Sequence, residues 1–143
     1  MPRLEKTLSV AASPEAVWNF AVDPSRWHTW FEGLSESKLI QGDGGKGTVV
    51  EHSMTVHGIP MPLKTTVVTF EPGCCWRAEY SGPMTRGSQQ WEYVASDGGT
   101  DLTFVMETEL SGPAKLAEKM VVNAFDQMTD RMLANLKAQV EGS

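Results

Sequence analysis

The chain has 143 residues, of which 41% are hydrophobic and 21% charged, a composition typical of one globular domain with a core of ordinary size. Acidic residues (18) outnumber basic residues (12), and the resulting formal net charge of -6 argues against partners that present a phosphate backbone or an anionic membrane surface. No apolar run reaches membrane-spanning length, and the first residues lack the apolar segment of a signal peptide. We therefore expect a single cytoplasmic domain over residues 1–143, with no nucleic-acid partner and no membrane insertion.

The N-terminal part predicts one strand followed by two short helices. Apolar and polar side chains alternate over residues 4–10, which is typical of a strand with one buried face. Ser13-Pro14-Glu15 then offers a capping side chain, a proline in the first turn and an acid near the positive end of a helix. Asp23-Pro24 repeats this start signal, and Gly33 ends the second helix.

From residue 34 to residue 110 the apolar period is two, and turn-forming residues recur at intervals. This pattern predicts strands near residues 35–42, 46–57, 63–71, 74–81, 86–95 and 100–110. Short connections such as Pro72-Gly73 favour an antiparallel meander. The sequence leaves open which face of strand 63–71 points inward. For strand 86–95 we choose Gln89, Trp91 and Tyr93 as the inward set, with Arg86, Gln90 and Glu92 as the alternative.

The stretch from Pro113 to Val140 predicts one long amphipathic helix, because apolar side chains recur at every fourth position. This row consists of Leu116, Met120, Ala124, Met128, Met132, Leu136 and Val140, and it is widened by Ala117, Val121, Phe125 and Leu133. A seven-stranded antiparallel sheet has to bury one face, and this helix is the large apolar element left to cover it. The predicted fold is therefore α+β, with a curved sheet wrapped around the C-terminal helix.

Several local sequences accompany this order of elements. They are Ser13-Pro14-Glu15-Ala16-Val17-Trp18, Asp23-Pro24-Ser25-Arg26-Trp27-His28-Thr29-Trp30, Gly47-Thr48-Val49, Phe70-Glu71-Pro72, Trp91-Glu92-Tyr93 and Gly98-Gly99-Thr100. Together they resemble the START-related helix-grip (SRPBCC) superfamily and, within it, the polyketide cyclase/dehydrase-like proteins. The resemblance covers nearly the whole chain and implies a deep apolar cavity between the concave sheet and the long helix. It implies no single function, because the ligands and chemistries of the superfamily vary.

The inward-facing positions of the predicted strands agree with such a cavity. Val50, His52, Met54 and Val56 share one face of their strand, and Cys74, Trp76, Ala78 and Tyr80 share one face of another. The residues predicted to contact a ligand are His52, Met54, Trp76, Tyr80, Trp91, Tyr93, Phe104, Met106, Phe125, Met128 and Met132. Aromatic and methionine side chains at these spacings are also typical of a plain packed core, so both interpretations stay open.

His52 and Tyr80 are the candidates for catalysis. Imidazole titrates near neutral pH, and a phenol can donate a hydrogen bond to a ligand carbonyl. The alternative for His52 is a hydrogen-bonded core histidine. Lys6 and Arg86 could hold an anionic group if they pointed inward, whereas solvated strand ends are the alternative for both.

No metal and no cofactor is expected. His57 falls on the strand face opposite His52, so the two side chains cannot chelate one ion without a bulge. Cys74 and Cys75 are interpreted as reduced thiols, because adjacent cysteines form neither an ordinary disulfide nor the spaced pairs of a zinc site. The GxGxxG pattern over residues 42–47 precedes a β-type run and predicts a hairpin, not a nucleotide site.

Three functions remain open at this point. The first, which we prefer, is the binding of a small hydrophobic ligand such as a lipid, a polyketide or an aromatic metabolite. The second is a polyketide cyclase or dehydratase that uses polar cavity residues and no metal; the enzymes of the superfamily share no fixed catalytic motif to transfer. The third is a toxin of a toxin-antitoxin pair, since residues 47–51, 58–60 and 70–72 also resemble small actinobacterial members, some labelled as toxins. The identity of the ligand and a homodimer formed through an outer strand stay open.

Overall fold

The computed structural model describes residues 2–56 and 58–142. In chain order the elements are β1 (Arg3–Val10), α1 (Pro14–Ala21), the 3-10 helix η1 (Pro24–Arg26), α2 (Trp27–Trp30), β2 (Lys38–Gln41), β3 (Val49–Val56), β4 (Ile59–Glu71), β5 (Cys75–Ser81), β6 (Thr85–Ser96), β7 (Gly99–Leu110), α3 (Pro113–Leu116) and α4 (Glu118–Glu141). The predicted α+β helix-grip architecture is confirmed. Ser13 and Asp23 accept hydrogen bonds as the N-caps of α1 and η1, as their positions in the sequence predict.

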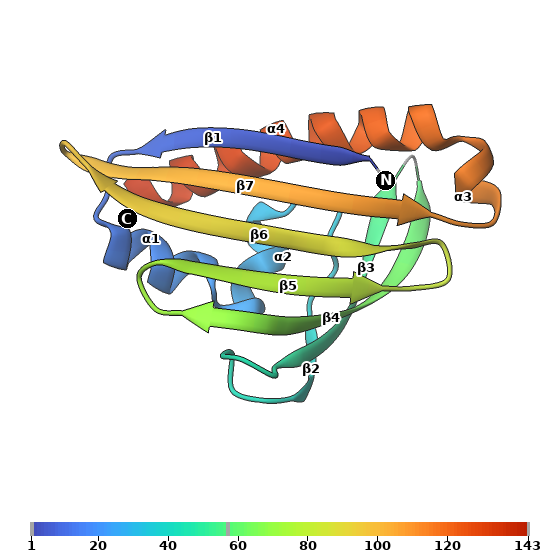
Figure 1. Cartoon of the computed structure of the whole chain (residues 1–143), viewed down its shortest axis with the longest axis horizontal. Helices are drawn as coiled ribbons and strands as arrows, with labels where there is room; N and C mark the ends of the chain where they lie inside the picture. The colour runs from blue at the N-terminus through green and yellow to red at the C-terminus, as the bar shows by residue number, and fades with distance from the viewer. Residues whose placement is uncertain (1, 57, 143) are drawn as a thin grey trace.

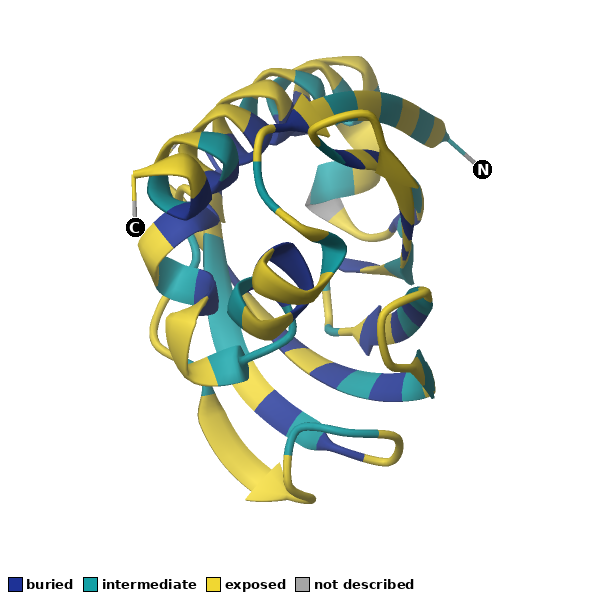
Figure 2. Cartoon of the chain, turned by 90° about the vertical axis from the view of Figure 1, so that its left-hand side faces the viewer, coloured by how far each residue is buried: buried dark blue, intermediate teal, exposed yellow. Residues whose placement is uncertain are grey.

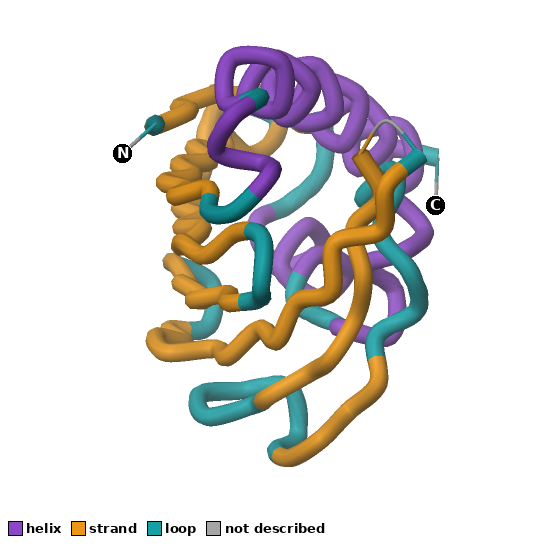
Figure 3. Tube along the Cα trace, turned by 90° about the vertical axis from the view of Figure 1, so that its right-hand side faces the viewer, coloured by secondary structure: helices purple, strands orange, loops and turns teal. Residues whose placement is uncertain are grey.

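The seven strands form one antiparallel sheet in the order β1-β7-β6-β5-β4-β3-β2. Strands that follow each other in the chain are adjacent in the sheet, except that β1 pairs with β7 and not with β2. The sheet curves around the helices, and α4 runs along its concave side (Figures 1 and 3). The GxGxxG stretch is a loop between β2 and β3, which pair with each other, so the hairpin prediction is also confirmed.

α4 turns a row of apolar side chains toward the sheet, and Figure 2 shows buried residues along that side of the helix. The buried residues of α4 are Val121, Phe125, Thr129, Met132, Leu133, Leu136 and Val140. Apart from the adjacent pair Met132 and Leu133, successive buried residues are three or four positions apart, so they lie on one side of a helix that has about 3.6 residues per turn. No helix among the described residues is long and apolar enough to cross a bilayer.

The prediction of one continuous helix from Pro113 to Val140 is wrong at its start. Ala117 has φ -108° and ψ 28°, outside helical geometry, and it separates α3 from α4. Leu116 and Met120 are 92% and 56% exposed, although the predicted row placed them on the buried face. Leu116 belongs to α3 and lies before this break. Within α4, a row at every fourth residue turns by about 40° per step, so it winds around the helix and cannot remain buried along its whole length.

A stack of tryptophans fills one end of the space between the sheet and the helices. Trp76 lies between Trp27 and Trp91, with ring centroids 5.8 and 5.9 Å away and nearly parallel planes. Trp30 meets Trp91 edge-on at 5.7 Å, and all four indoles are at most 2% exposed. A second hydrophobic cluster forms at the other end, from Val56, Met61, Leu110, Val121 and Phe125. The interior is therefore divided into two packed regions.

The inward phases of the two uncertain strands are now defined. On β4, Met61, Leu63, Thr65 and Val67 are buried, and the register then shifts by a bulge between Val67 and Thr69. On β6 the chosen phase is confirmed, because Trp91 and Tyr93 are buried. Cys74 is exposed in the turn before β5, so its predicted inward position is wrong. The alternation of a strand does not extend into the turn that precedes it.

Candidate functional site

A pocket lies between the concave face of the sheet and the middle of α4. Its walls come from α2 and the following loop, from β3 to β7, and from α4. The lining residues are Trp27, Phe31, Glu32, Leu34, His52, Met54, Met61, Leu63, Thr65, Tyr80, Thr85, Gln89, Phe104, Met106, Phe125, Met128, Thr129 and Met132. These residues belong in part to each of the two packed regions, so the pocket lies where the regions meet.

The pocket is large in outline but narrow inside. The space between its walls, open mouth included, measures about 770 Å³, but the cavity volume is only about 60 Å³. Five methionine side chains line the pocket, namely Met54, Met61, Met106, Met128 and Met132. Methionine is unbranched and changes rotamer easily, so these walls can adjust to a guest at low cost. The pocket is therefore adaptable and mostly apolar.

Most of the residues predicted to contact a ligand are brought together here. His52, Met54, Tyr80, Phe104, Met106, Phe125, Met128 and Met132 all line the pocket. Trp76, Trp91 and Tyr93 do not line it. They lie in and beside the stack of tryptophans, where the indole Nε1 of Trp76 donates to the hydroxyl of Tyr93 at 3.0 Å. Their rings face inward as predicted, but other aromatic rings occupy the space in front of them.

His52 is held in the wall by two hydroxyl groups. Its Nδ1 lies 3.1 Å from Ser37 Oγ, and its Nε2 lies 2.8 Å from Thr65 Oγ1. Burial lowers the pKa of His52 to about 4, so the ring is neutral at neutral pH. A base with so low a pKa removes protons poorly, which makes His52 better suited to positioning than to proton transfer.

Tyr80 is likewise held in its neutral form. Its hydroxyl donates to the carbonyl of Glu107 at 3.3 Å, and burial raises its pKa to about 12. The donor is thus already engaged by the main chain of β7. A ligand could compete for this proton, but it would meet no phenolate at neutral pH.

Gln89 presents a polar group at the pocket wall. The indole Nε1 of Trp91 donates to Gln89 Oε1 at 3.1 Å. Because an indole N–H can only donate, this bond holds the amide oxygen toward Trp91 and leaves the amide nitrogen as a donor for another partner. The alternating pattern of β6 had predicted that Gln89 faces inward, and its place in the lining agrees with that phase.

The rim near α2 includes residues that sequence reasoning missed. Glu32 accepts a hydrogen bond from Arg131 of α4, and the carbonyl of Gly33 accepts one from the amide of Thr55 at 2.8 Å. Gly33 has φ 85°, and a Cβ there would meet the carbonyl oxygen of Thr55 at 2.8 Å. The chain therefore passes close to β3 at this point because the residue is glycine. A loop residue such as Glu32 carries no periodic signal that could have placed it at the pocket.

The two basic candidates lie outside the pocket lining. Lys6 pairs with Asp126 at 2.8 Å and with Asp130 at 3.2 Å, which ties β1 to α4 and raises the pKa of the lysine. Arg86 is exposed and pairs with Glu109 at 3.1 Å. Neither side chain lines the pocket. Arg86 matches the alternative of a solvated strand end, whereas Lys6 does not, because it lies in the middle of β1 and is paired with α4.

The two cysteines are free thiols at the turn between β4 and β5. Hydrogen bonds to Cys74 and to Glu71 raise the pKa of the Cys75 thiol to about 12, so this thiol is protonated at neutral pH. The other histidine weighed in the metal question, His57, lies outside the described residues.

Residues 1–141 match the family described as polyketide cyclase/dehydrase and lipid transport. The chain belongs to this family. The match confirms the resemblance predicted from the local sequences and covers every helix and strand of the fold. Membership supports a ligand-binding or cyclase role.

Solved structures with the same fold include proteins of different kinds. The Zhui aromatase/cyclase from Streptomyces sp. R1128 superposes with a TM-score of 0.85 at 16% identity, over 98% of this chain and 93% of that one. A START superfamily protein from Mycobacterium smegmatis superposes with a TM-score of 0.80 at 16% identity, over 98% of this chain and 97% of that one. At such identities the likeness establishes the shared helix-grip fold alone.

Two curated relatives come from Mycobacterium tuberculosis and are named Toxin Rv0910 and Toxin MT0934. Each is 35% identical to this chain over 74 residues, which is 50% of this chain and 51% of the relative. The match therefore spans about half the length of these relatives.

Proposed function

We propose that this protein binds a small, uncharged, hydrophobic molecule in the pocket between the sheet and α4. The observation that carries the proposal is the chemistry of the lining. Flexible methionines and aromatic rings provide most of it. Two of its titratable side chains, His52 and Tyr80, are neutral at neutral pH. The third, Glu32 at the rim, is paired with Arg131 of α4. An apolar site with a few neutral polar groups suits a lipid, a polyketide or an aromatic metabolite.

The polar groups give the ligand one orientation. The amide nitrogen of Gln89 supplies a hydrogen-bond donor, because its oxygen is taken by Trp91. A ligand carbonyl or hydroxyl oxygen placed against this donor would leave the rest of the molecule among the methionines. Binding is preferred over catalysis because neither His52 nor Tyr80 has a pKa near neutrality.

The proposal is tested with the neutral fluorophore N-phenyl-1-naphthylamine, which is dark in water and bright in apolar sites. We expect saturable binding of one molecule per chain, and loss of that binding in Met54→Trp, because the larger indole fills the pocket. Thr55→Trp is the matched control: it adds the same side chain to the next position of β3, which is exposed, and should leave binding unchanged. Equal binding by the wild type and by folded Met54→Trp would overturn the assignment of the pocket.

Turnover is distinguished from binding by adding a poly-β-keto thioester and analysing the products by mass spectrometry. Recovery of unchanged substrate supports binding. Cyclised or dehydrated product that is lost in folded His52→Ala would overturn the proposal in favour of an enzyme. Growth arrest caused by expression of both the wild type and Met54→Trp would instead favour a toxin that acts without the pocket.

A further inference from the structure

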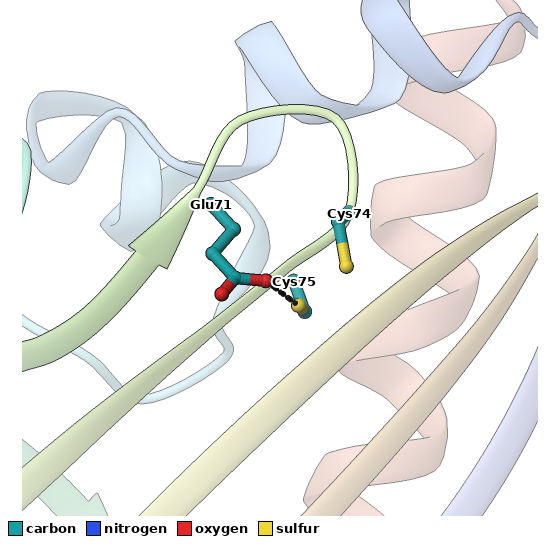
Figure 4. A group of neighbouring side chains, drawn as sticks. All are labelled: Glu71, Cys74 and Cys75. Atoms are coloured by element: carbon teal, nitrogen blue, oxygen red, sulfur yellow. Dashed lines mark hydrogen bonds between the residues drawn. The ribbon is translucent and has the colours of Figure 1, made fainter.

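The turn between β4 and β5 brings together two thiols and a carboxylate, on the outside of the molecule and away from the pocket. Glu71 is the last residue of β4, Cys75 is the first of β5, and Cys74 precedes it in the turn. Figure 4 shows the three side chains on the same side of this turn. One ligand atom from each residue, the two Sγ atoms and a carboxylate oxygen, lies within 4.8 Å of the others.

The backbone fixes this arrangement. Pro72 and Gly73 occupy the centre of the turn, Gly73 has φ 78°, and the amide of Cys74 donates to the carbonyl of Glu71 at 3.0 Å. Proline followed by a glycine with positive φ is the preferred pair for a type II turn. The amide of Tyr93 donates to the carbonyl of Cys74 at 2.8 Å, so β6 also anchors the turn. The three ligand groups are thus held by the hairpin before any ion arrives.

We propose that Glu71, Cys74 and Cys75 form an open site for a thiophilic divalent cation of the Zn²⁺ class. Two thiolates and one carboxylate oxygen are ligands that zinc accepts, and three protein ligands leave the fourth tetrahedral position to water or to an external ligand. This site is independent of the pocket and of the function proposed for it. It departs from the sequence-based expectation that the chain has no metal site.

The contact between Glu71 and Cys75 indicates how the ion would enter. The thiol of Cys75 donates to Glu71 Oε2 at 3.1 Å, so a proton now occupies the space between a sulfur and an oxygen. A divalent cation can replace this proton and offset the repulsion between the ionised groups. Arg77, the next residue on the same face of β5, is paired with Glu79 at 3.5 Å, which draws its positive charge away along the strand.

A disulfide between the two cysteines is the competing chemistry, and the geometry disfavours it. Adjacent Cα atoms across a trans peptide are about 3.8 Å apart, whereas disulfides usually span about 4.4–6.8 Å. No cis peptide bond occurs among the described residues. The paired thiols are therefore available to an ion, and the exposed position of Cys74 leaves a path from solvent.

The test is titration of the reduced full-length protein with Cd²⁺, which reports thiolate ligation by an ultraviolet charge-transfer band, followed by competition with Zn²⁺. We expect one cadmium per chain, uptake coupled to proton release, and displacement by zinc. Cys74→Ser and Cys75→Ser should each abolish high-affinity binding, and Glu71→Gln should weaken it by at least about tenfold. Asp97→Asn is the matched control, because it removes one negative charge from another exposed hairpin turn and should change nothing.

Other results would overturn the site. Two cadmium ions per chain, each lost with a different cysteine, would mean that the thiols act as separate surface groups. Unchanged affinity in Glu71→Gln, or an equal loss in Asp97→Asn, would exclude the carboxylate as a ligand. Circular dichroism of each variant verifies that its fold is intact. The fluorophore assay of the pocket is unaffected by these substitutions, so this proposal and the proposed function can fail separately.

Discussion

His52 illustrates how the surroundings of one residue decide what it can do. Its ring is hydrogen-bonded to the hydroxyl groups of Ser37 and Thr65. Among the described residues, no carboxylate bonds to the ring and stabilises its charged form. Burial alone therefore controls its pKa. Sequence reasoning placed this histidine on the inward face of its strand, but it could not distinguish a base from a neutral wall group, because that depends on neighbours from distant parts of the chain.

The low pKa of His52 predicts a pH dependence of stability. The unfolded chain takes up a proton on this residue near pH 6.5, and the folded chain only near pH 4. Its contribution is therefore complete above pH 6.5 and is lost as the pH falls toward 4. Between pH 7 and pH 5 we expect the wild type to lose about 2 kcal/mol more free energy of unfolding than His52→Gln, measured by urea denaturation. Carboxylates titrate equally in both proteins, so parallel pH profiles would contradict the assignment.

Single positions also show where sequence patterns end. Met54 and Met106 were predicted to line a cavity from strand alternation, and the structure places both there. Glu32 and Leu34 line the same pocket from a loop, where no period exists to indicate a direction. Glu71 comes close to the two cysteines only because the turn between β4 and β5 brings it there. Considered alone in the sequence, the adjacent thiols predicted no metal site.

At the scale of the element, the stability that a leucine of the C-terminal helices contributes depends on whether its side chain faces the sheet. Leu136 is 0% exposed, and Leu116, which precedes α4 at the end of α3, is 92% exposed. Leu136→Ala should lower the free energy of unfolding by about 2–5 kcal/mol, because it removes buried methyl groups and leaves a cavity. Leu116→Ala makes the same chemical change on the surface and should cost less than about 0.5 kcal/mol. Chemical denaturation of the two variants checks this, and equal effects would contradict the exposed position of Leu116.

β4 shows why the phase of one strand could not be read from its residues. Thr65, Thr66, Val67 and Val68 are all compatible with a buried face, so alternation gives no preference there. The bulge between Val67 and Thr69 then moves Phe70 onto the inward side, where its ring lies 5.1 Å from that of Trp18. A bulge shifts every following side chain by one position, and the sequence carries no clear mark of it.

On the scale of the whole molecule, the two edge strands of the sheet differ in how firmly they are held. β2 has four residues, all exposed, and pairs only with β3. β1 is the other edge, but Lys6 ties it to α4 through Asp126 and Asp130. β6 pairs on both sides and carries buried Trp91 and Tyr93. Stability against local opening should therefore rise from β2 to β1 to β6.

Amide hydrogen exchange measures this order directly. We expect the amides of β2 to exchange at least about a hundredfold faster than those of β6, because β2 can open without disturbing the core. β1 should fall between the two, and Lys6→Met should move it toward β2. Protection of β2 equal to that of β6 would mean that this edge is covered in solution, as a homodimer formed through an outer strand would cover it.

The overall architecture was the most predictable feature. The number of strands, their antiparallel meander and the covering helix follow from period, turn residues and the need to bury one face, and those signals are repeated along the chain. The pairing of β1 with β7 was not predicted from the sequence. The pocket was predictable only in outline. Its walls combine residues from a loop, several strands and two helices. The pattern of alternation also predicted Trp76, Trp91 and Tyr93 as ligand contacts, but these side chains belong to the packed core.

The pairing of β1 with β7 has a consequence for how the chain acquires its structure in the cell. β1 leaves the ribosome first, but its partner strand follows almost a hundred residues later, and α4 comes after that. Until then only the short helices α1 and α2 can cover the concave side of the growing sheet, and the rest of its core is open to water. Folding to completion must therefore wait until synthesis has passed α4, and this interval is when the nascent protein depends most on chaperones.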